Sequence, residues 1–241
     1  MNRLHTGITG FDALIEGGFP EGTTTLLTGP TGSGKTLFGL QYLFTGASEH
    51  AESGICVTLE TRPSDLRQEA SQFGWDLSEL EEQGRFTIID AASSKAQLPT
   101  SEKYALKRGF DMDSLAEMIY NVIESTDAKR LVLDSIPGLM LRFNEPSEVR
   151  RELYRLSSLL NELRMTSLFI GEIDTKHESV GVEKFVTQGL ITLDISETNG
   201  ILKRSLLVRK MRFTSHDMKR HEFVIGKSGI KISKTSSKEK K

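Results

Sequence analysis

Apolar residues along the chain alternate between two spacings, and each spacing predicts one kind of element. Short runs rich in apolar and β-branched residues predict buried strands, and they span residues 23–28, 54–59, 86–90, 131–133 and 166–171. Between them, apolar residues recur every three or four positions, which predicts helices over residues 37–47, 65–73, 113–125 and 147–164. Ser64 or Asp65 is predicted to cap the second of these helices, which Gly74 ends. This alternation is typical of an α/β fold with a mainly parallel sheet flanked by helices.

The pattern changes in the last fifth of the chain, where strands follow one another without helices. Four consecutive strands are predicted, over residues 189–195, 202–211, 222–225 and 229–232. They predict an antiparallel extension on one side of the sheet. We therefore expect one domain over residues 1–233. Residues 234–241 form a Lys- and Ser-rich tail, which is too polar to pack and is expected to be disordered, either solvated or in weak contact with nucleic acid.

Charge and composition narrow the class of protein. The net charge is −2, but residues 227–241 carry six Lys and one Glu, so the rest of the chain carries about −7. The main body therefore lacks the strongly basic surface of a nucleic-acid-binding protein, and such binding is not favoured. No apolar run reaches the roughly 18 residues of a membrane span, and the first residues are too polar for a signal peptide. The single Cys56 lies in an apolar run, which fits a small buried residue and a reducing, cytoplasmic setting.

The most specific motif is GPTGSGKT at residues 29–36, which matches G-x-x-x-x-G-K-S/T in full. It follows a predicted strand and precedes a predicted helix, the context in which such a loop binds nucleotide phosphates. Glycine lacks Cβ, so the backbone can curl with its N–H groups toward the β-phosphate. The helix that follows presents its positive end to the same anion. The predicted phosphate-binding residues are Gly29, Thr31, Gly32, Ser33, Gly34, Lys35 and Thr36.

Three polar residues extend this site toward magnesium and hydrolysis. The Thr36 hydroxyl is the expected Mg²⁺ ligand. Asp134 ends a buried strand, where a carboxylate can hold the same ion through a water. Glu60 follows the strand over residues 54–59, and if that strand lies beside the loop strand, the carboxylate would face the γ-phosphate and could position a water. Spacing alone leaves Glu60 open to being an ordinary surface carboxylate.

An ordered set of further motifs identifies a family resemblance. TGITGFD at residues 6–12 and GGFPEG at 17–22 lead into the loop, and several more follow over the rest of the chain: VTLE at 57–60, FGWDL at 73–77, LDS at 133–135, VRRELYRL at 149–156, GVEKFV at 181–186, KMR at 210–212 and TSH at 214–216. The chain resembles the KaiC-type ATPases of the RecA superfamily over about residues 3–233. The resemblance implies a RecA-like P-loop NTPase fold with ATP and Mg²⁺ as ligands.

The resemblance also implies roles for single residues. Glu60 becomes the water-activating carboxylate, although this chain has Thr61 where the family commonly has a second Glu, which predicts slow turnover. Lys210 and Arg212 match a K-x-R motif that reaches the γ-phosphate bound by a neighbouring subunit. Two residues apart, they are expected on one face of a strand. His216 resembles a histidine close to the same nucleotide.

Residues that act on a neighbour's nucleotide require a closed ring, and the family forms hexamers. We therefore expect a homo-hexameric ATPase that acts in signalling or regulation with a protein partner that the sequence does not identify. One alternative is a DNA-repair accessory ATPase similar to RecA paralogues. Another is an ATP-binding assembly switch that hardly hydrolyses ATP. Autophosphorylation stays open, and Glu172 is a candidate phosphate sensor at the end of the strand over residues 166–171.

Overall fold

The structure is a computed structural model that describes residues 1–96, 98–106, 111–140, 143, 145–172 and 186–233. The predicted tail at 234–241 and most of the GVEKFV motif lie outside these residues. The strands are β1 (Arg3–Leu4), β2 (Phe19–Pro20), β3 (Thr24–Gly29), β4 (Gly54–Thr58), β5 (Phe86–Asp90), β6 (Tyr104–Ala105), β7 (Arg130–Asp134), β8 (Thr166–Glu172), β9 (Gly189–Thr198), β10 (Ile201–Met211), β11 (His221–Gly226) and β12 (Gly229–Ile232). The helices are η1 (Asp12–Ile15, a 3-10 helix), α1 (Lys35–Glu49), α2 (Pro63–Ser71), α3 (Leu77–Glu82), α4 (Ala92–Lys95), α5 (Met112–Thr126), α6 (Ile136–Met140) and α7 (Pro146–Glu162).

One mixed sheet organises the molecule. Within the described ranges it has ten strands, in the order β12-β11-β10-β9-β3-β8-β7-β4-β5-β6. The pairs from β9 through β3 to β6 are parallel, and β9, β10, β11 and β12 pair antiparallel in succession. The predicted α/β class, the mainly parallel sheet and the antiparallel C-terminal extension are confirmed.

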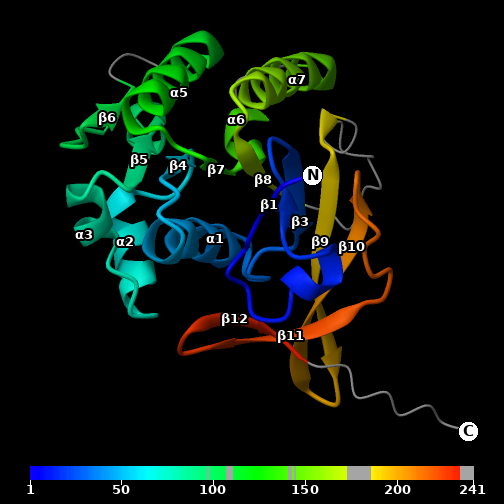
Figure 1. The fold of residues 1–241 in the computed structure, drawn as a ribbon. Coiled ribbons are helices and arrows are strands. Elements are labelled where there is room, and N and C mark those ends of the chain that lie inside the picture. The colour runs from blue at the N-terminus through cyan, green and yellow to red at the C-terminus, as the bar shows by residue number, and fades with distance from the viewer. Residues whose placement is uncertain (97, 107–110, 141–142, 144, 173–185, 234–241) are drawn as a thin grey trace, which may run out of the picture.

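Two apolar cores cover the two faces of the sheet, because neighbouring residues of a buried strand point to opposite sides. In β3, Leu27 joins a core with α1, α2 and α3, and Leu26 joins a second core with α5, α6 and α7. Figure 1 shows these two groups of helices on opposite sides of the sheet. Cys56 is buried in the first core, as its apolar run predicts.

The sheet order corrects one expectation. β4, the strand before Glu60, does not lie beside β3, the strand of the phosphate loop, because β8 and β7 lie between them. Glu60 nevertheless reaches the same edge as the loop, since β3, β8, β7 and β4 are parallel and their carboxyl ends meet there.

The start of α2 corrects a second expectation. The helix begins at Pro63, and its cap residue Arg62 makes no side-chain cap hydrogen bond, so neither Ser64 nor Asp65 caps it. Proline suits the first helical position, since its fixed φ fits the helix and its missing N–H would be unpaired there. The same proline holds Arg62 in an extended conformation. The short elements β1, β2, η1, α3, α4, β6 and α6 were not predicted.

Candidate functional site

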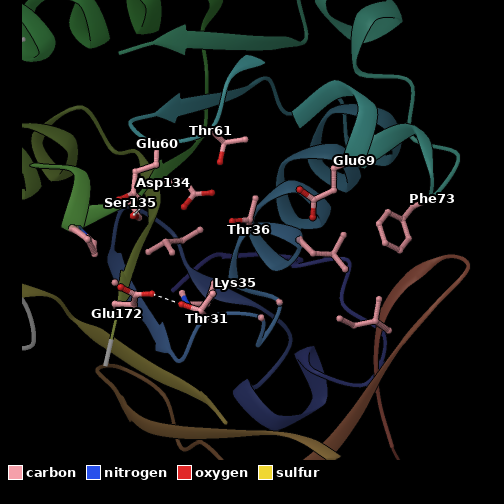
Figure 2. Close-up of a pocket in the computed structure, with 17 residues that line it drawn as sticks. Thr31, Lys35, Thr36, Glu60, Thr61, Glu69, Phe73, Asp134, Ser135 and Glu172 are labelled. Atoms are coloured by element: carbon pink, nitrogen blue, oxygen red, sulfur yellow. Dashed lines mark hydrogen bonds between the residues drawn. The ribbon is translucent and has the colours of Figure 1, made fainter. Parts of the chain in front are cut away.

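A cavity of about 410 Å³ opens at the carboxyl ends of the parallel strands. The phosphate loop after β3 lines one side, and residues that follow β4 and β7 line another. Glu172 at the end of β8 and Ile225 of β11 contribute from further along the chain. Figure 2 shows that these side chains converge on one space from several elements. In an open parallel sheet, ligands bind at this edge.

Glycines give the loop its shape. Gly32 and Gly34 have φ angles of 79° and 98°, in the left-handed region that glycine adopts without strain. A Cβ on Gly29 would lie 2.7 Å from Leu193 O, so only glycine fits beside β9. The Ser33 hydroxyl is buried and has no hydrogen-bond partner in the described structure. The predicted order of strand, loop and helix is confirmed, since the loop follows β3 and Gly34 is the cap residue of α1.

Lys35 lies folded over this loop. Its ammonium group donates hydrogen bonds to Gly29 O at 2.8 Å and Pro30 O at 3.0 Å. Burial lowers the pKa of Lys35, and the nearby carboxylates of Glu172, Asp134 and Glu60 partly oppose this effect. A cation in this position can exchange two backbone carbonyls for phosphate oxygens without moving its backbone.

Asp134 and Thr36 lie together at the cavity wall. Asp134 is 8% exposed, and burial raises its pKa to about 6, a rise that the Thr36 hydrogen bond to the carboxylate and the Lys35 charge reduce and the charge of Glu60 increases. A hydroxyl and a carboxylate are hard oxygen donors of the kind that Mg²⁺ prefers. No group of three or more His, Cys, Asp or Glu that could hold a metal occurs among the described residues. The pair therefore fits an ion that takes its other ligands from phosphates and water, as Mg²⁺ does.

Glu60 lies exposed at the cavity rim, next to Asp134. Its Oε2 atom accepts a hydrogen bond from Ser135 Oγ. The backbone supports the same arrangement, because Leu59 N donates to Asp134 O at 2.7 Å. On the other side of the loop, Thr31 Oγ1 donates to Glu172 Oε1 at 2.7 Å, and Glu172 ends β8. Two carboxylates therefore flank the region in front of Lys35.

Sequence reasoning missed several residues that line the cavity. Ser135 belongs to the LDS motif but carried no predicted role, and the same holds for Phe73 of the FGWDL motif, whose ring stacks on Trp75 with centroids 5.0 Å apart. Glu69 of α2 also faces the cavity, and burial raises its pKa. A single carboxylate on a charged helix gives no sequence signal. Ile225 is far away along the chain and could not be connected to the loop without the fold.

The predicted trans-acting residues do not line this cavity. Lys210 lies in β10, after a register shift, and donates a hydrogen bond to Thr187 O at 2.6 Å. Arg212 is exposed and lies one residue past the end of β10, so the expectation that both residues occupy the strand holds only for Lys210. Their charges are close, because Arg212 adds to the effect of burial in lowering the pKa of Lys210. His216 Nδ1 lies 3.2 Å from Asp217 O.

Comparisons with known proteins agree with one another. Residues 4–237 match the family model described as "ATPase: KaiC". A UPF0273 protein of Methanocaldococcus jannaschii is 39% identical over 234 residues, which are 95% of this chain and 96% of that protein. The crystal structure of a KaiC-like protein from Pyrococcus horikoshii superposes with a TM-score of 0.84 at 43% identity, covering 97% of this chain and 99% of that one.

A longer relative is also similar. The circadian clock oscillator protein KaiC of Parathermosynechococcus lividus is 36% identical over 233 residues, which are 95% of this chain but 42% of that protein.

Among the helices that the structure describes, none has both the length and the apolar character of a membrane span.

Proposed function

The chain belongs to the KaiC family of ATPases, and from that premise we propose that it hydrolyses ATP with Mg²⁺ at sites completed between the subunits of a hexameric ring. The observation that carries this proposal is the convergence of Lys35, Asp134 and Glu60 on one cavity beside the phosphate loop. Lys35 begins α1 after the phosphate loop, Asp134 ends β7 and Glu60 follows β4, and hydrolysis of a phosphoanhydride uses all three kinds of group.

The phosphates are proposed to lie against the loop. The N–H groups of Gly32, Ser33 and Gly34 and the amino end of α1 would bind the β-phosphate, with Gly29 and Thr31 completing the loop. Lys35 would exchange the Gly29 and Pro30 carbonyls for oxygens of the β- and γ-phosphates. The positive charge of Lys35 would then lie against the phosphate oxygens, which lose their hydration when the nucleotide binds.

Thr36 and Asp134 are the residues that would hold Mg²⁺. When bound, the ion neutralises charge on the β- and γ-phosphate oxygens. Asp134 would act ionised, and the Thr36 hydroxyl would turn from the carboxylate to the ion, since a hydroxyl oxygen has lone pairs to offer once its proton points away.

Glu60 is proposed to accept a proton from the attacking water at Oε1. The water oxygen forms a bond to the γ-phosphorus while the bond from that phosphorus to the β-phosphate oxygen breaks, giving ADP and inorganic phosphate. Ser135 keeps Oε2 occupied and so fixes the orientation of the carboxylate. Proton transfer to a positioned general base such as Glu60 typically contributes a factor of about 10²–10⁴ in rate.

Lys210, Arg212 and His216 are proposed to act on the nucleotide of the neighbouring subunit. The supporting observation is an excess of negative charge around the cavity. Glu60, Asp134 and Glu172 line it, whereas Lys35 is the only cation among the described residues that line it. A cation pair from another subunit would neutralise charge that develops on the γ-phosphate. Such contacts between identical chains close into a ring.

A second candidate function is an ATP-dependent assembly switch with little hydrolysis. It is favoured by Thr61, which stands where the family commonly has a second Glu and whose carbonyl accepts a hydrogen bond from Thr58 Oγ1.

A DNA-repair role is supported by the Lys-rich tail, and binding of DNA at low salt would test it. We further propose one domain over residues 1–233 and a cytoplasmic regulatory role, which the lone buried Cys56 is compatible with.

The test compares phosphate release and sedimentation for wild type and Glu60→Gln. The proposal expects a ring in ATP and Mg²⁺ for both proteins, with release by Glu60→Gln at least about 100-fold slower. Equal, very slow release by both proteins would favour the switch. A protein that stays monomeric in ATP and Mg²⁺ would refute the shared active site.

A further inference from the structure

The side chain of Arg3 is held in a socket built by the motif at residues 17–22 and the turn before it. The side chain is 16% exposed. Nη1 donates to Ile15 O and to Gly18 O, both at 3.1 Å, and Nη2 donates to Glu16 Oε2 at 2.7 Å. Arginine offers five donors in a fixed planar fork, so these contacts define its orientation.

Two left-handed residues shape this socket. Gly18 has a φ of 137°, and a Cβ there would lie 2.2 Å from Leu4 O, so β1 can approach this closely only because the residue is glycine. Glu16 has a φ of 58° at the end of η1, which turns its carboxylate back toward Arg3. The GGFPEG motif, to which the ATP site assigns no role, thus places a guanidinium at a defined point.

The same guanidinium also contacts a segment more than 200 residues away in the sequence. Nη1 shares its two N–H groups among Ile15 O, Gly18 O and Thr214 Oγ1, the last at 3.0 Å, and Nη2 donates to Phe213 O at 3.0 Å. These residues lie between Arg212 and His216. We call residues 212–216 the finger loop, since it holds two of the three proposed trans-acting residues.

Among the residues that the structure describes, the finger loop has few other supports. Phe213 is 65% exposed and has a φ of 62°, which is unfavourable for a residue with a side chain. Arg212 N donates to Gln188 O at 3.0 Å, which holds the first residue of the loop. Just beyond the last residue, Asp217 N donates to Leu14 O at 2.9 Å. Between these two anchors, the contacts to Arg3 hold the middle of the loop.

We propose that Arg3 is a positioning residue that sets the conformation of the finger loop and thereby aims Arg212 and His216 at the nucleotide of the neighbouring subunit. The inference rests on the proposed trans role of this loop. Arg3 itself touches neither the cavity nor the phosphate loop. Its loss should therefore lower turnover by the neighbour's site while ATP affinity in its own subunit stays nearly unchanged.

Mixed rings separate this role from ordinary support of the fold. Arg3→Ala subunits keep their own Lys35, Glu60 and Asp134, whereas Glu60→Gln subunits keep an intact finger loop. Each variant alone should release phosphate at least about tenfold more slowly than wild type. When the two are mixed, a Glu60→Gln subunit supplies its finger loop to an Arg3→Ala neighbour, and phosphate release should rise several-fold above the mean of the separate proteins.

A parallel mixture of Lys210→Ala with Glu60→Gln tests the underlying trans mechanism. Gain in both mixtures supports the inference. Gain with Lys210→Ala but none with Arg3→Ala overturns the role of Arg3 alone, because its loss then damages its own subunit. No gain in either mixture overturns the proposed shared site and the inference with it.

Two milder variants guard against misfolding of Arg3→Ala. Glu16→Ala removes an ion-pair partner of Arg3 without touching the finger loop, and Arg3→Lys keeps the charge but loses the fork. Both should lower turnover less than Arg3→Ala, leave the KM for ATP within about twofold, and gain in the same mixture. Arg155→Ala, which removes an exposed arginine of α7, is the matched control and should match wild type. Turnover at the wild-type level in Arg3→Lys and Glu16→Ala alike would contradict the proposal.

Discussion

Ser135 Oγ donates a hydrogen bond to Glu60 Oε2, which joins the residue after β7 to the residue that follows β4 by two positions. The two strands are parallel neighbours, and Leu59 N donates to Asp134 O at their shared end. The carboxylates of Glu60 and Asp134 therefore belong to one rigid corner of the sheet. The proposed proton acceptor and the candidate magnesium ligand are therefore held in a fixed relation to each other.

Glu60→Gln should bind ATP with Mg²⁺ but release phosphate at least about 100-fold more slowly, because an amide cannot accept the proton of the attacking water. Ser135→Ala should have a smaller effect, about tenfold, since it removes only the hydrogen bond that orients the carboxylate. Phosphate release under saturating ATP measures both. A larger loss in Ser135→Ala than in Glu60→Gln would contradict these roles.

Lys35→Ala should weaken ATP binding by at least about tenfold, because a hydrogen bond to a charged group contributes about 1.5–3 kcal/mol. Titration calorimetry with ATP and Mg²⁺ measures the Kd. Lys129→Ala is the matched control, since Lys129 is an exposed cation before β7, at the opposite edge of the sheet. Equal affinities in the two variants would remove Lys35 from the binding site.

Asp134→Asn should stabilise the nucleotide-free protein at pH 8. Burial raises the pKa of Asp134 from 3.8 to about 6, so ionising it in the folded state costs up to about 3 kcal/mol. The stability that its protonated form gives is fully present below pH 3.8 and is lost as the pH rises through about 6. The difference in Tm between variant and wild type should therefore be several degrees at pH 8 and shrink toward pH 4.

The same variant should lose stabilisation by ligand. ATP with Mg²⁺ should raise the Tm of wild type more than that of Asp134→Asn, since binding to the folded state alone stabilises it. ATP with excess EDTA is the control, in which the two proteins should respond alike. A pH-independent Tm difference would argue against the buried charge, and an equal response to ATP and Mg²⁺ would argue against the ion.

Gly18→Ala should destabilise the fold by about 2 kcal/mol or more, since the new Cβ would meet Leu4 O at 2.2 Å in a backbone conformation that side chains rarely adopt. Gly200→Ala is the matched control: its φ is 75°, but no atom lies within 4 Å of the added Cβ. Urea unfolding of the two variants isolates the clash from the backbone strain. Equal losses would mean that the approach of β1 is not what requires glycine.

Much of the fold and part of the site followed from local sequence. The strands β3, β4, β5, β7 and β8 were predicted, within one or two residues at their ends, because buried strands are short apolar runs. The phosphate loop was predicted because its glycines and Lys35 lie within eight consecutive residues. The predicted start of α2 was wrong, because the helix begins at Pro63 and the polar residues after it do not cap it. Glu69 and Ser135 gave no usable signal, because a lone polar residue has no periodicity.

The chain by itself determined the phosphate loop, the carboxylate at the end of β7 and the alternation that makes a parallel sheet, because steric limits and side-chain periodicity act between near neighbours. Only the tertiary structure decided that β8 and β7 lie between β3, which leads into the phosphate loop, and β4, which leads to Glu60, and that Arg3 reaches Thr214. Crossover connections set which strand ends meet, and such contacts between distant residues leave no local pattern.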